Sequence, residues 1–167
     1  MIFRPQPLET SRFQAYGDLV DLNPNGKGLS INSGTATSWG DLADIQVLQQ
    51  DGKPKVSIYR AQPVSLPAEL SELECHPLGS QMFVPLGRHP YLVVVAESGE
   101  LNLDTLRVFQ ARPDQAVNFH PGVWHHYLLA LQGVSDFLVL DRGGPETNLQ
   151  QVRLPQPLTV EPMENKP

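Results

Sequence analysis

The stretch "QMFVPLGRHPYLVVVAE" (residues 81–97) contains two short apolar segments separated by the turn-forming sequence "LGRHP". Because short apolar runs bounded by Gly and Pro are typical of β-strands, we predict strands at 81–86 and 91–97. The same pattern continues on both sides and predicts further strands at 55–62, 106–111, 116–120, 124–131 and 136–142. Many short strands joined by turns indicate an antiparallel sandwich or barrel. The mouth or interior of such a barrel can hold one small ligand.

The two ends of the chain predict less regular structure. Residues 8–16 indicate one short helix, with Thr10 or Ser11 as its N-cap, and residues 38–45 predict another helical turn. The C-terminal segment, about 155–167, is expected to be a strand remnant followed by a loose tail. With 167 residues and no internal repeat, the chain has the size of one domain with one sizeable core.

The composition argues against several classes of protein. A net charge of −6 and the lack of a Lys/Arg cluster disfavour a nucleic-acid-binding protein. The longest apolar run, "YLVVVA", is too short to span a bilayer, and no basic amphipathic segment would bind a membrane surface. The N-terminus lacks the apolar stretch of a signal peptide, and a single cysteine, Cys75, cannot form an internal disulfide. We therefore expect a cytoplasmic protein that acts on a small molecule.

Residues 74–81 combine several polar groups that could carry chemistry. Cys75 and His76 look like a nucleophilic pair, but neighbours on an extended strand point to opposite faces, so Cys75 is expected to be a half-buried thiol. Glu74 and His76 are two residues apart and share a face. A barrel could bring them together with Gln81 and the distant His125. Two imidazoles and two oxygen donors suit a borderline divalent metal or, equally, a hydrogen-bonding pocket for a polar substrate.

Three histidines lie in the segment "NFHPGVWHH" (118–126). Strand alternation allows at most one of His125 and His126 to face the interior, and it puts Trp124 on the same side as His126. His120 ends the preceding strand, just before a Pro-Gly reversal. One of the three histidines is therefore expected on the surface.

Two arginines are candidates for binding a carboxylate, because the guanidinium fork matches two oxygen atoms at once. Strict alternation predicts Arg60 on the same, apolar face of its strand as Val56 and Ile58. Arg142 ends another strand. The alternatives are that either arginine reaches solvent or that Arg142 pairs locally with Asp141.

Several of these segments resemble the ureidoglycolate lyase family. The segments that carry the resemblance are "ELECHPLGSQMFVPL" (72–86), "YLVVVA" (91–96), "VNFHPGVWHHYLLAL" (117–131) and "SDFLVLDRGG" (135–144), supported by "FQAYGDLV" (13–20) and "SIYRAQP" (57–63). The pairing of the HPLGSQ segment with the GVWHH segment is specific. The chain departs from the family at Cys75, where Arg is expected, and at Tyr127, where Pro is expected.

The resemblance implies a cupin-like antiparallel β-barrel or jelly roll, mainly β with one or two short helices near the N-terminus, and usually a homodimer. It implies cleavage of ureidoglycolate to glyoxylate and urea during the degradation of allantoin. In metal-binding cupins a H-x-H-x4-E motif and a later His hold the ion. Glu74, His76, Gln81 and His125 match those positions, with Glu and Gln substituted. The resemblance thus selects His125 and leaves His126 as the expected bystander. The resemblance thereby implies a divalent ion, nickel or zinc, while leaving the need for it open.

Together, these observations give a set of expected site residues. The expected catalytic residues are His76 and His125, with His120 as a third member. The expected substrate-binding residues are Arg60 or Arg142 for the carboxylate, Gln81 and Glu74 for the ureido group or a metal, and Tyr59, Phe83 and Trp124 for the walls. The competing hypotheses are a different metal-dependent cupin enzyme acting on a small carboxylate and a non-catalytic cupin that binds a glyoxylate-like ligand.

Overall fold

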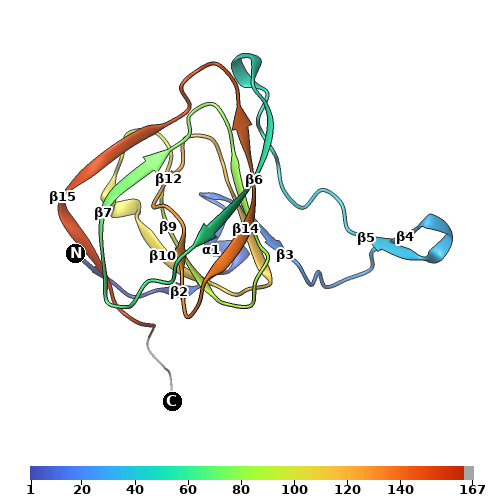
Figure 1. The fold of residues 1–167 in the computed structure, drawn as a ribbon, viewed down its shortest axis with the longest axis horizontal. Helices are drawn as coiled ribbons and strands as arrows, with labels where there is room; N and C mark the ends of the chain where they lie inside the picture. Colours follow the sequence, from blue (N-terminus) through green and yellow to red (C-terminus); the bar gives the residue numbers. More distant parts are fainter. Residues whose placement is uncertain (164–167) are drawn as a thin grey trace.

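Two β-sheets face each other and curl into a barrel-like body, from which a short hairpin extends to one side (Figure 1). The structure is a computed structural model that describes residues 1–163. Strands dominate it, and the few helical segments are short. This arrangement confirms the mainly β, cupin-like fold predicted from the sequence.

The strands of the two main sheets are far apart in the sequence. The first sheet has eight strands, in the order β1 (Ile2–Phe3), β15 (Gln150–Val160), β7 (Ala68–Cys75), β12 (Trp124–His125), β9 (Tyr91–Ala96), β10 (Arg107–Ala111) and β2 (Gln6–Pro7), with β13 (Leu129–Ala130) also paired to β9. The second sheet has five strands, in the order β3 (Gly17–Asp21), β11 (Gln115–Phe119), β8 (Gln81–Pro85), β14 (Ser135–Gly143) and β6 (Lys53–Ala61). Pairing among these described strands is antiparallel except for β1 with β15 and β2 with β10.

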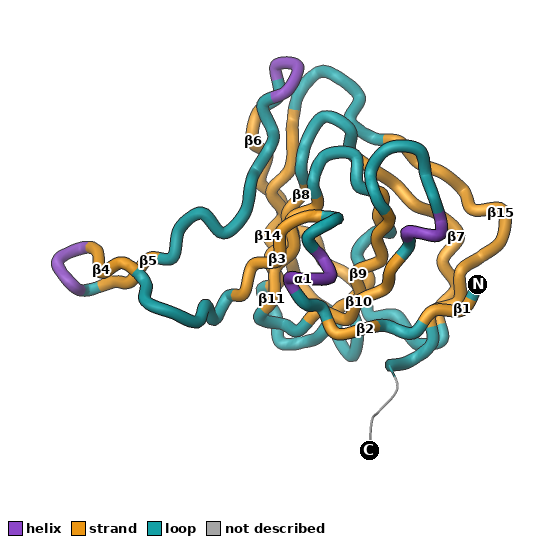
Figure 2. The backbone as a smooth tube through the Cα atoms, turned by 180° about the vertical axis from the view of Figure 1, so that it is seen from behind, coloured by secondary structure: helices purple, strands orange, loops and turns teal. Residues whose placement is uncertain are grey.

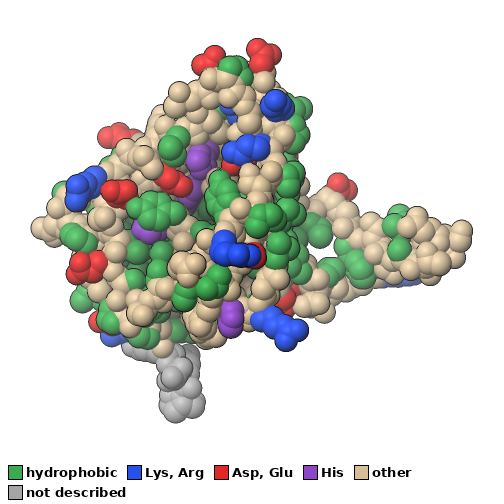
Figure 3. All heavy atoms as spheres, viewed as in Figure 1, with side chains coloured by type: hydrophobic (Ala, Val, Ile, Leu, Met, Phe, Trp, Pro, Cys, Tyr) green, Lys and Arg blue, Asp and Glu red, His purple; other side chains and the backbone are tan. Residues whose placement is uncertain are grey.

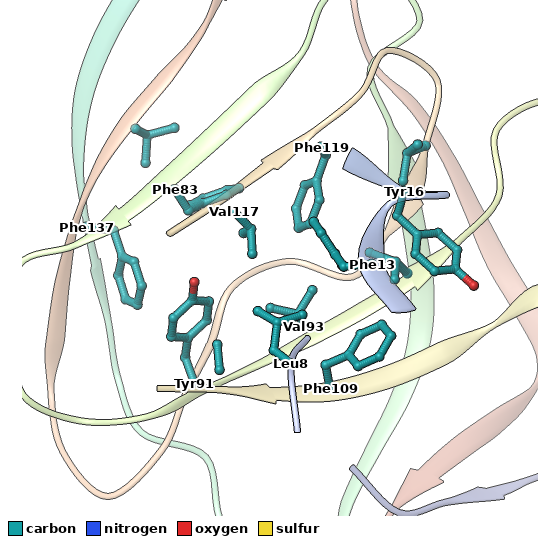
Figure 4. Close-up of a cluster of buried hydrophobic side chains, with 14 residues drawn as sticks. Leu8, Phe13, Tyr16, Phe83, Tyr91, Val93, Phe109, Val117, Phe119 and Phe137 are labelled. Carbon is teal, nitrogen blue, oxygen red and sulfur yellow. The ribbon is translucent and has the colours of Figure 1, made fainter. Parts of the chain in front are cut away.

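Strand β9 is buried on both faces and joins two hydrophobic clusters. Tyr91, Val93 and Val95 point into a cluster between the two sheets, whereas the alternate residues point into a second cluster enclosed by the first sheet. Figure 4 shows that aromatic side chains from both sheets and from the N-terminal segment converge in the first cluster. Since a fully buried Val or Leu contributes roughly 1.5–3 kcal/mol, the apolar run "YLVVVA" is a major source of stability.

The N-terminal helix is shorter than the prediction over residues 8–16. Helix α1 covers Thr10–Phe13, and its N-cap is Glu9, whose side chain makes no capping hydrogen bond. The prediction that Thr10 or Ser11 caps the helix was therefore wrong. The helix is held instead by the fully buried Phe13, whose ring meets the ring of Phe109 edge-on at 6.0 Å between centroids.

The helical turn predicted over 38–45 does not form. Beyond the end of β5, the backbone there is irregular and bonds to other parts of the chain rather than to itself. The backbone N–H of Asp44 donates to the Asp18 side chain at 2.9 Å, and the N–H of Gln46 donates to the Ser80 hydroxyl at 2.9 Å. These long-range partners replace the local hydrogen bonds that a helix requires.

Residues 22–46 form an extended arm that projects from the body (Figure 2). Its outer part is the hairpin of β4 (Leu29–Ile31) and β5 (Ala36–Ser38), closed by the 3-10 turn Asn32–Gly34. Two further 3-10 turns, Gln49–Asp51 and Leu103–Thr105, lie in connections of the body. Among residues 1–163, no helix is long and apolar enough to cross a membrane.

The strand predicted over 124–131 is divided into β12 and β13. His125 lies opposite Val95, whereas Leu129 lies opposite Leu92, so four steps along one strand match three along the other. One extra residue is therefore accommodated in the interval 126–128, as in a β-bulge. Strict alternation of faces cannot be extended through this interval.

Part of the segment predicted as a strand remnant and loose tail, from about residue 155, is a regular strand. Strand β15 continues to Val160, pairs with β7 and β1, and buries Leu154, Leu158 and Val160 in the second cluster. The register shifts between Arg153 and Leu158, and this irregularity accommodates the two prolines of "LPQPL". Residues 164–167 lie outside the described part of the chain.

We predict that Gly17→Ala will strongly destabilise the fold. A Cβ atom at this position would lie 1.9 Å from the backbone oxygen of Asn118 on the paired strand β11, and a backbone atom cannot move aside cheaply. We expect a loss of roughly 1–3 kcal/mol or more in the free energy of unfolding, measured by urea denaturation. Gly87→Ala is the matched control, because nothing lies within 4 Å of its Cβ position. Equal stability of the two variants would contradict the close approach of β3 and β11.

Candidate functional site

A pocket of about 940 Å³ opens between the β6–β14–β8 side of the second sheet and strand β7 of the first. Figure 3 shows histidine side chains inside a hollow on this face, with acidic and basic side chains beside it. The polar side chains that line the pocket are Lys55, Glu74, His76, Gln81, Tyr127, Asp141, Arg142 and Asn148, among others. The pocket therefore gathers most of the residues singled out in the sequence.

Glu74, His76 and His125 converge at one end of the site. One ligand atom from each residue lies within 4.8 Å of the others. The convergence follows from strand register, because His125 on β12 lies directly opposite Glu74 on β7. His76 follows directly after β7, and its ring centroid lies 5.3 Å from that of His125. Gln81 borders the same pocket from β8.

Three atoms of this group are buried and have no hydrogen-bond partner among the described residues: His76 Nε2, His125 Nε2 and Gln81 Oε1. The Nδ1 atom of His76 lies 2.7 Å from the Asn148 carbonyl oxygen, which can only accept, so Nδ1 carries the proton and Nε2 of the neutral ring keeps its lone pair. Buried unpaired acceptors are costly and rare. Together with the Glu74 carboxylate, they fit a divalent cation or a polar ligand that donates hydrogen bonds.

His125 is held in the interior as a neutral ring. The residue is only 1% exposed, and its ring stacks on Phe119 at 4.6 Å between centroids. Burial, and after it the neighbouring His76, lowers the pKa of His125 to about 3. At neutral pH its ring is therefore unprotonated, which is the state that a metal ligand requires.

His126 is also buried, so the prediction that it is a surface bystander was wrong. The residue is 8% exposed and borders a small cavity together with Phe83, Phe119 and Leu128. Burial lowers the pKa of His126. Alternation failed here because the extra residue in the interval 126–128 interrupts the regular strand.

His120 does not join the other two expected catalytic histidines. Its Nε2 atom lies 3.2 Å from the Asp18 carboxylate, and the residue is not part of the pocket wall. The same carboxylate oxygen accepts hydrogen bonds from the side chain of Asn118 and the backbone of Asp44, each at 2.9 Å. His120 thus belongs to a polar group that joins β3, β11 and the arm.

Arg60 shares a face with Val56 and Ile58, but that face is exposed to solvent rather than packed in the core. Val56 and Ile58 are 63% and 59% exposed, because β6 is an edge strand of the second sheet. The Arg60 guanidinium donates two 2.8 Å hydrogen bonds to the carboxylate of Asp136, its cross-strand partner. Arg60 borders the pocket, but two nitrogen atoms of its guanidinium already bond Asp136.

Arg142 is 5% exposed and also lines the pocket. It donates to the backbone oxygens of Gln49 at 2.9 Å and Gln50 at 2.8 Å, and its Nη1 atom has no partner within the described chain. A Cβ atom on Gly52 would lie 2.5 Å from its Nε, so the guanidinium is tightly enclosed. The alternative of a local pairing with Asp141 is not observed.

The expected wall residues divide between two places. Tyr59 and Phe83 line the pocket, and their rings meet edge-on at 6.2 Å between centroids. Trp124 packs instead in the second cluster and donates its indole N–H to the Gly99 oxygen at 2.9 Å. Its neighbour His125 takes the opposite, inward side, as alternation predicts for this regular part of the strand.

Three charged pocket residues were not predicted for the site from the sequence: Lys55, Asp141 and Glu146. Lys55 on β6 and Asp141 on β14 are cross-strand partners, and Lys55 Nζ lies 3.2 Å from Asp141 Oδ2. The Asp141 residue is 9% exposed, and its Oδ1 atom has no partner among residues 1–163. The sequence signal was weak, because their proximity depends on a register that a single strand does not reveal.

The comparison with known proteins now assigns the chain to a family. A family model described as ureidoglycolate lyase matches residues 1–161. The chain belongs to the ureidoglycolate lyase family. It is 46% identical over 153 residues to a Burkholderia mallei protein named ureidoglycolate lyase, which covers 92% of this chain and 89% of the relative. A protein of the same name from Burkholderia cepacia is 44% identical over 92% of this chain and 86% of its own length. Another from Salmonella typhimurium is 44% identical over 84% of this chain and 87% of its own length.

We predict that the Asp18 group stabilises this ureidoglycolate lyase family member in a pH-dependent way. Burial raises the pKa of Asp18, but hydrogen bonds from Asn118, Asp44 and His120 lower it more, so its net pKa is below the usual value. The stabilisation is therefore present above about pH 4, the unfolded pKa, and is lost as the pH falls through the folded pKa. Asp18→Ala should reduce the free energy of unfolding by about 1–3 kcal/mol at pH 7, and by less at pH 3.

Urea denaturation at both pH values measures this difference. The exposed Glu100, which lies on another connection of the body, provides the control variant Glu100→Ala. If wild type and Asp18→Ala differ in their free energy of unfolding by the same amount at pH 7 and at pH 3, the ionised carboxylate is not the source of the stabilisation.

Proposed function

We propose that this chain cleaves ureidoglycolate to glyoxylate and urea, as a cytoplasmic enzyme of allantoin degradation that acts as one domain over residues 1–167. The observation that carries the proposal is the convergence of Glu74, His76 and His125, in a chain of this family. Of these residues, Glu74 and His76 line the pocket beside Gln81. The relatives named ureidoglycolate lyase cover most of the chain at 44–46% identity, which supports a shared reaction.

The substrate has a hydroxyl group and a ureido nitrogen on the same carbon, which also carries a carboxylate. A base takes the hydroxyl proton, the oxygen's electron pair forms the carbonyl of glyoxylate, and the C–N bond breaks. The leaving urea nitrogen gains a proton, so no water is consumed. The site must therefore accept one proton, supply one proton and hold the carboxylate.

His76 and His125 have unpaired, buried Nε2 atoms and so suit one of two roles. They either share the proton transfers or hold a divalent ion, nickel or zinc, together with Glu74 and Gln81. When bound, such an ion supplies Lewis acidity to an oxygen atom of the substrate. In both cases Asn148 orients the His76 ring, and Phe119 orients the His125 ring by stacking.

The carboxylate and ureido groups require further contacts. In the proposed complex, Gln81 and Glu74 bind the ureido group where they do not hold an ion, and Tyr59 and Phe83 form the walls. Arg60 and Arg142 are the arginines expected to bind the carboxylate, but their fork atoms already bond Asp136 and two backbone oxygens, respectively. Arg142 Nη1 is a buried donor without a partner among residues 1–163, and it is tightly enclosed.

We predict that His76→Ala and His125→Ala each lower the turnover of ureidoglycolate by on the order of 10²-fold or more. The physical reason is the loss of a buried Nε2 atom that has no hydrogen-bond partner among the described residues. Urea, glyoxylate and ammonia are measured with purified protein and racemic substrate. Urea without ammonia is expected from the wild type, and near-normal urea release by both variants would reject the assignment.

A chelator and metal analysis separate the two roles of the histidines. Turnover that survives chelation in metal-free protein assigns His76 and His125 to proton transfer. Turnover that is lost and then restored by nickel or zinc, with less bound metal in both variants, assigns them to an ion. His89→Ala, which changes a histidine outside this pocket, serves as the control and should keep wild-type turnover and metal content.

We also propose that the protein forms a homodimer through the outer face of β6 and the arm. Val56 and Ile58 expose large apolar side chains on β6, and Figure 3 shows hydrophobic side chains gathered on this part of the surface. Leu29 and Trp39 on the arm are 70% and 40% exposed. Apolar residues on a flat sheet face and on a projecting arm suit a second copy, because the arm of one copy can cover the sheet of the other.

Ile58→Glu is predicted to convert the dimer to a monomer, because it introduces a charge into the buried centre of the proposed interface. The molecular mass is measured by size-exclusion chromatography with light scattering. Leu48→Glu is the matched control, since Leu48 is 73% exposed but lies outside both surfaces. A wild-type monomer, or a dimer that persists in Ile58→Glu, would rule out this interface.

A further inference from the structure

We propose that Lys55 and Asp141 form the substrate-anchoring pair of the pocket: the Lys55 ammonium binds the carboxylate, and Asp141 Oδ1 accepts an N–H of the ureido group. This inference rests on the proposed function and identifies where the two ends of the substrate bind. Neither residue was among those expected from the sequence for substrate binding.

The position of the pair follows from strand register. Lys55 on β6 lies opposite Asp141 on β14. Asp141 directly follows Leu140, which lies opposite Met82 on β8, so the next position across the sheet is that of Gln81. Gln81 in turn lies opposite Phe119 on β11. These four residues form a row across adjacent strands.

The row ends beside the reacting groups. The ring of Phe119 stacks on His125, which lies next to His76 and Glu74. Along this row, Asp141 lies two strand spacings, roughly 10 Å, from Phe119, and Lys55 lies three spacings, roughly 14 Å, from it. A substrate that is anchored by the pair can direct its hydroxyl-bearing carbon towards the histidines.

Asp141 has the properties of a group that binds a hydrogen-bond donor of a ligand. Its side chain is 12% exposed, Oδ2 faces Lys55 at 3.2 Å, and Oδ1 is buried without a partner among the described residues. An unsatisfied buried carboxylate oxygen is costly. The carboxylate of the substrate cannot relieve this cost, because it has no hydrogen to donate, whereas the ureido group offers N–H donors.

Lys55 has the complementary properties. Its side chain is 49% exposed and lines the pocket. The ammonium has three hydrogens, and among residues 1–163 it contacts one acceptor, Asp141 Oδ2. In contrast to Arg142, it can bind an anion without giving up hydrogen bonds to the backbone. The ammonium lies 3.2 Å from Asp141 Oδ2, and Oδ1 of the same carboxylate is the free acceptor. This neighbouring cation and acceptor match a molecule whose carboxylate and ureido nitrogen share one carbon.

The test uses three ligands whose binding to the full-length protein is measured by calorimetry. N-carbamoylglycine has the carboxylate and the ureido group but no hydroxyl, so it cannot be cleaved in the proposed reaction. Glyoxylate has only the carboxylate, and urea has only the ureido nitrogens. The variants are Lys55→Met, Lys55→Arg and Asp141→Asn, with Lys53→Met as the control on the same strand outside the pocket.

Lys55→Met should weaken binding of both N-carbamoylglycine and glyoxylate by about 10-fold or more, whereas Lys55→Arg, which keeps the charge, should retain most of it. Asp141→Asn should weaken N-carbamoylglycine by about 10-fold or more and leave glyoxylate within roughly 3-fold. Binding of urea should be weakened by Asp141→Asn but not by Lys55→Met. Lys53→Met should bind all three ligands like the wild type, and thermal unfolding checks that each variant is folded.

The results distinguish this inference from the proposed function. Normal binding of glyoxylate by Lys55→Met, or equal weakening of glyoxylate and N-carbamoylglycine by Asp141→Asn, overturns the pair while urea release by the wild type still supports the lyase. Wild-type protein that binds N-carbamoylglycine in the predicted pattern but releases no urea supports the pair and rejects the lyase. Wild-type protein that does not bind N-carbamoylglycine overturns the inference directly.

Discussion

The insertion of β12 between β7 and β9 is the constraint on which the fold and the site both depend. His125 pairs with Glu74 on one side and with Val95 on the other, so a strand of only two residues joins two parts of the first sheet. The same pairing carries Trp124 into the second cluster and His125 towards the pocket. A shift of one residue would exchange these faces, because the side-chain period of a strand is two. The pairing of β12 with the apolar strand β9 therefore fixes the side of the sheet to which His125 points.

Several buried atoms of the pocket have lone pairs without partners in the described chain. They are His76 Nε2, His125 Nε2, Gln81 Oε1 and Asp141 Oδ1. Each unpaired buried group costs on the order of 1–3 kcal/mol, and the packing around β9 must offset that cost. A ligand or ion that satisfies these atoms recovers part of it and so stabilises the folded state. Binding and stability should thus be linked in this protein.

The sequence predicted those parts of the structure that depend on local pattern or on a motif. The strands at 55–62, 81–86 and 91–97 are found close to the predicted bounds, because their apolar residues and turns are local signals. The meeting of Glu74, His76 and His125 also followed from a recognisable motif. The helix at 38–45 failed because the backbone there bonds to Asp18 and Ser80, which are distant in sequence. No local propensity contains that information.

The remaining errors share a dependence on register. The buried position of His126 follows from one extra residue in the interval 126–128, and the exposure of Arg60 follows from the place of β6 at a sheet edge. The pair of Lys55 and Asp141 needs the alignment of two strands separated by many residues. Such facts are properties of strand pairs, so a reading of single strands cannot supply them.

The two departures from the family pattern differ in their consequences. Cys75 points into the second cluster, where burial raises the pKa of its thiol to about 11, so it remains a protonated packing group that faces away from the pocket. Tyr127, where the family resemblance implies Pro, lines the pocket and donates its hydroxyl to Glu72 at 3.1 Å. Cys75 therefore lies outside the pocket, whereas Tyr127 is part of its wall. A proline could not make this hydrogen bond, so this chain gains a polar contact on the β7 side of the pocket, next to the strand that carries Glu74.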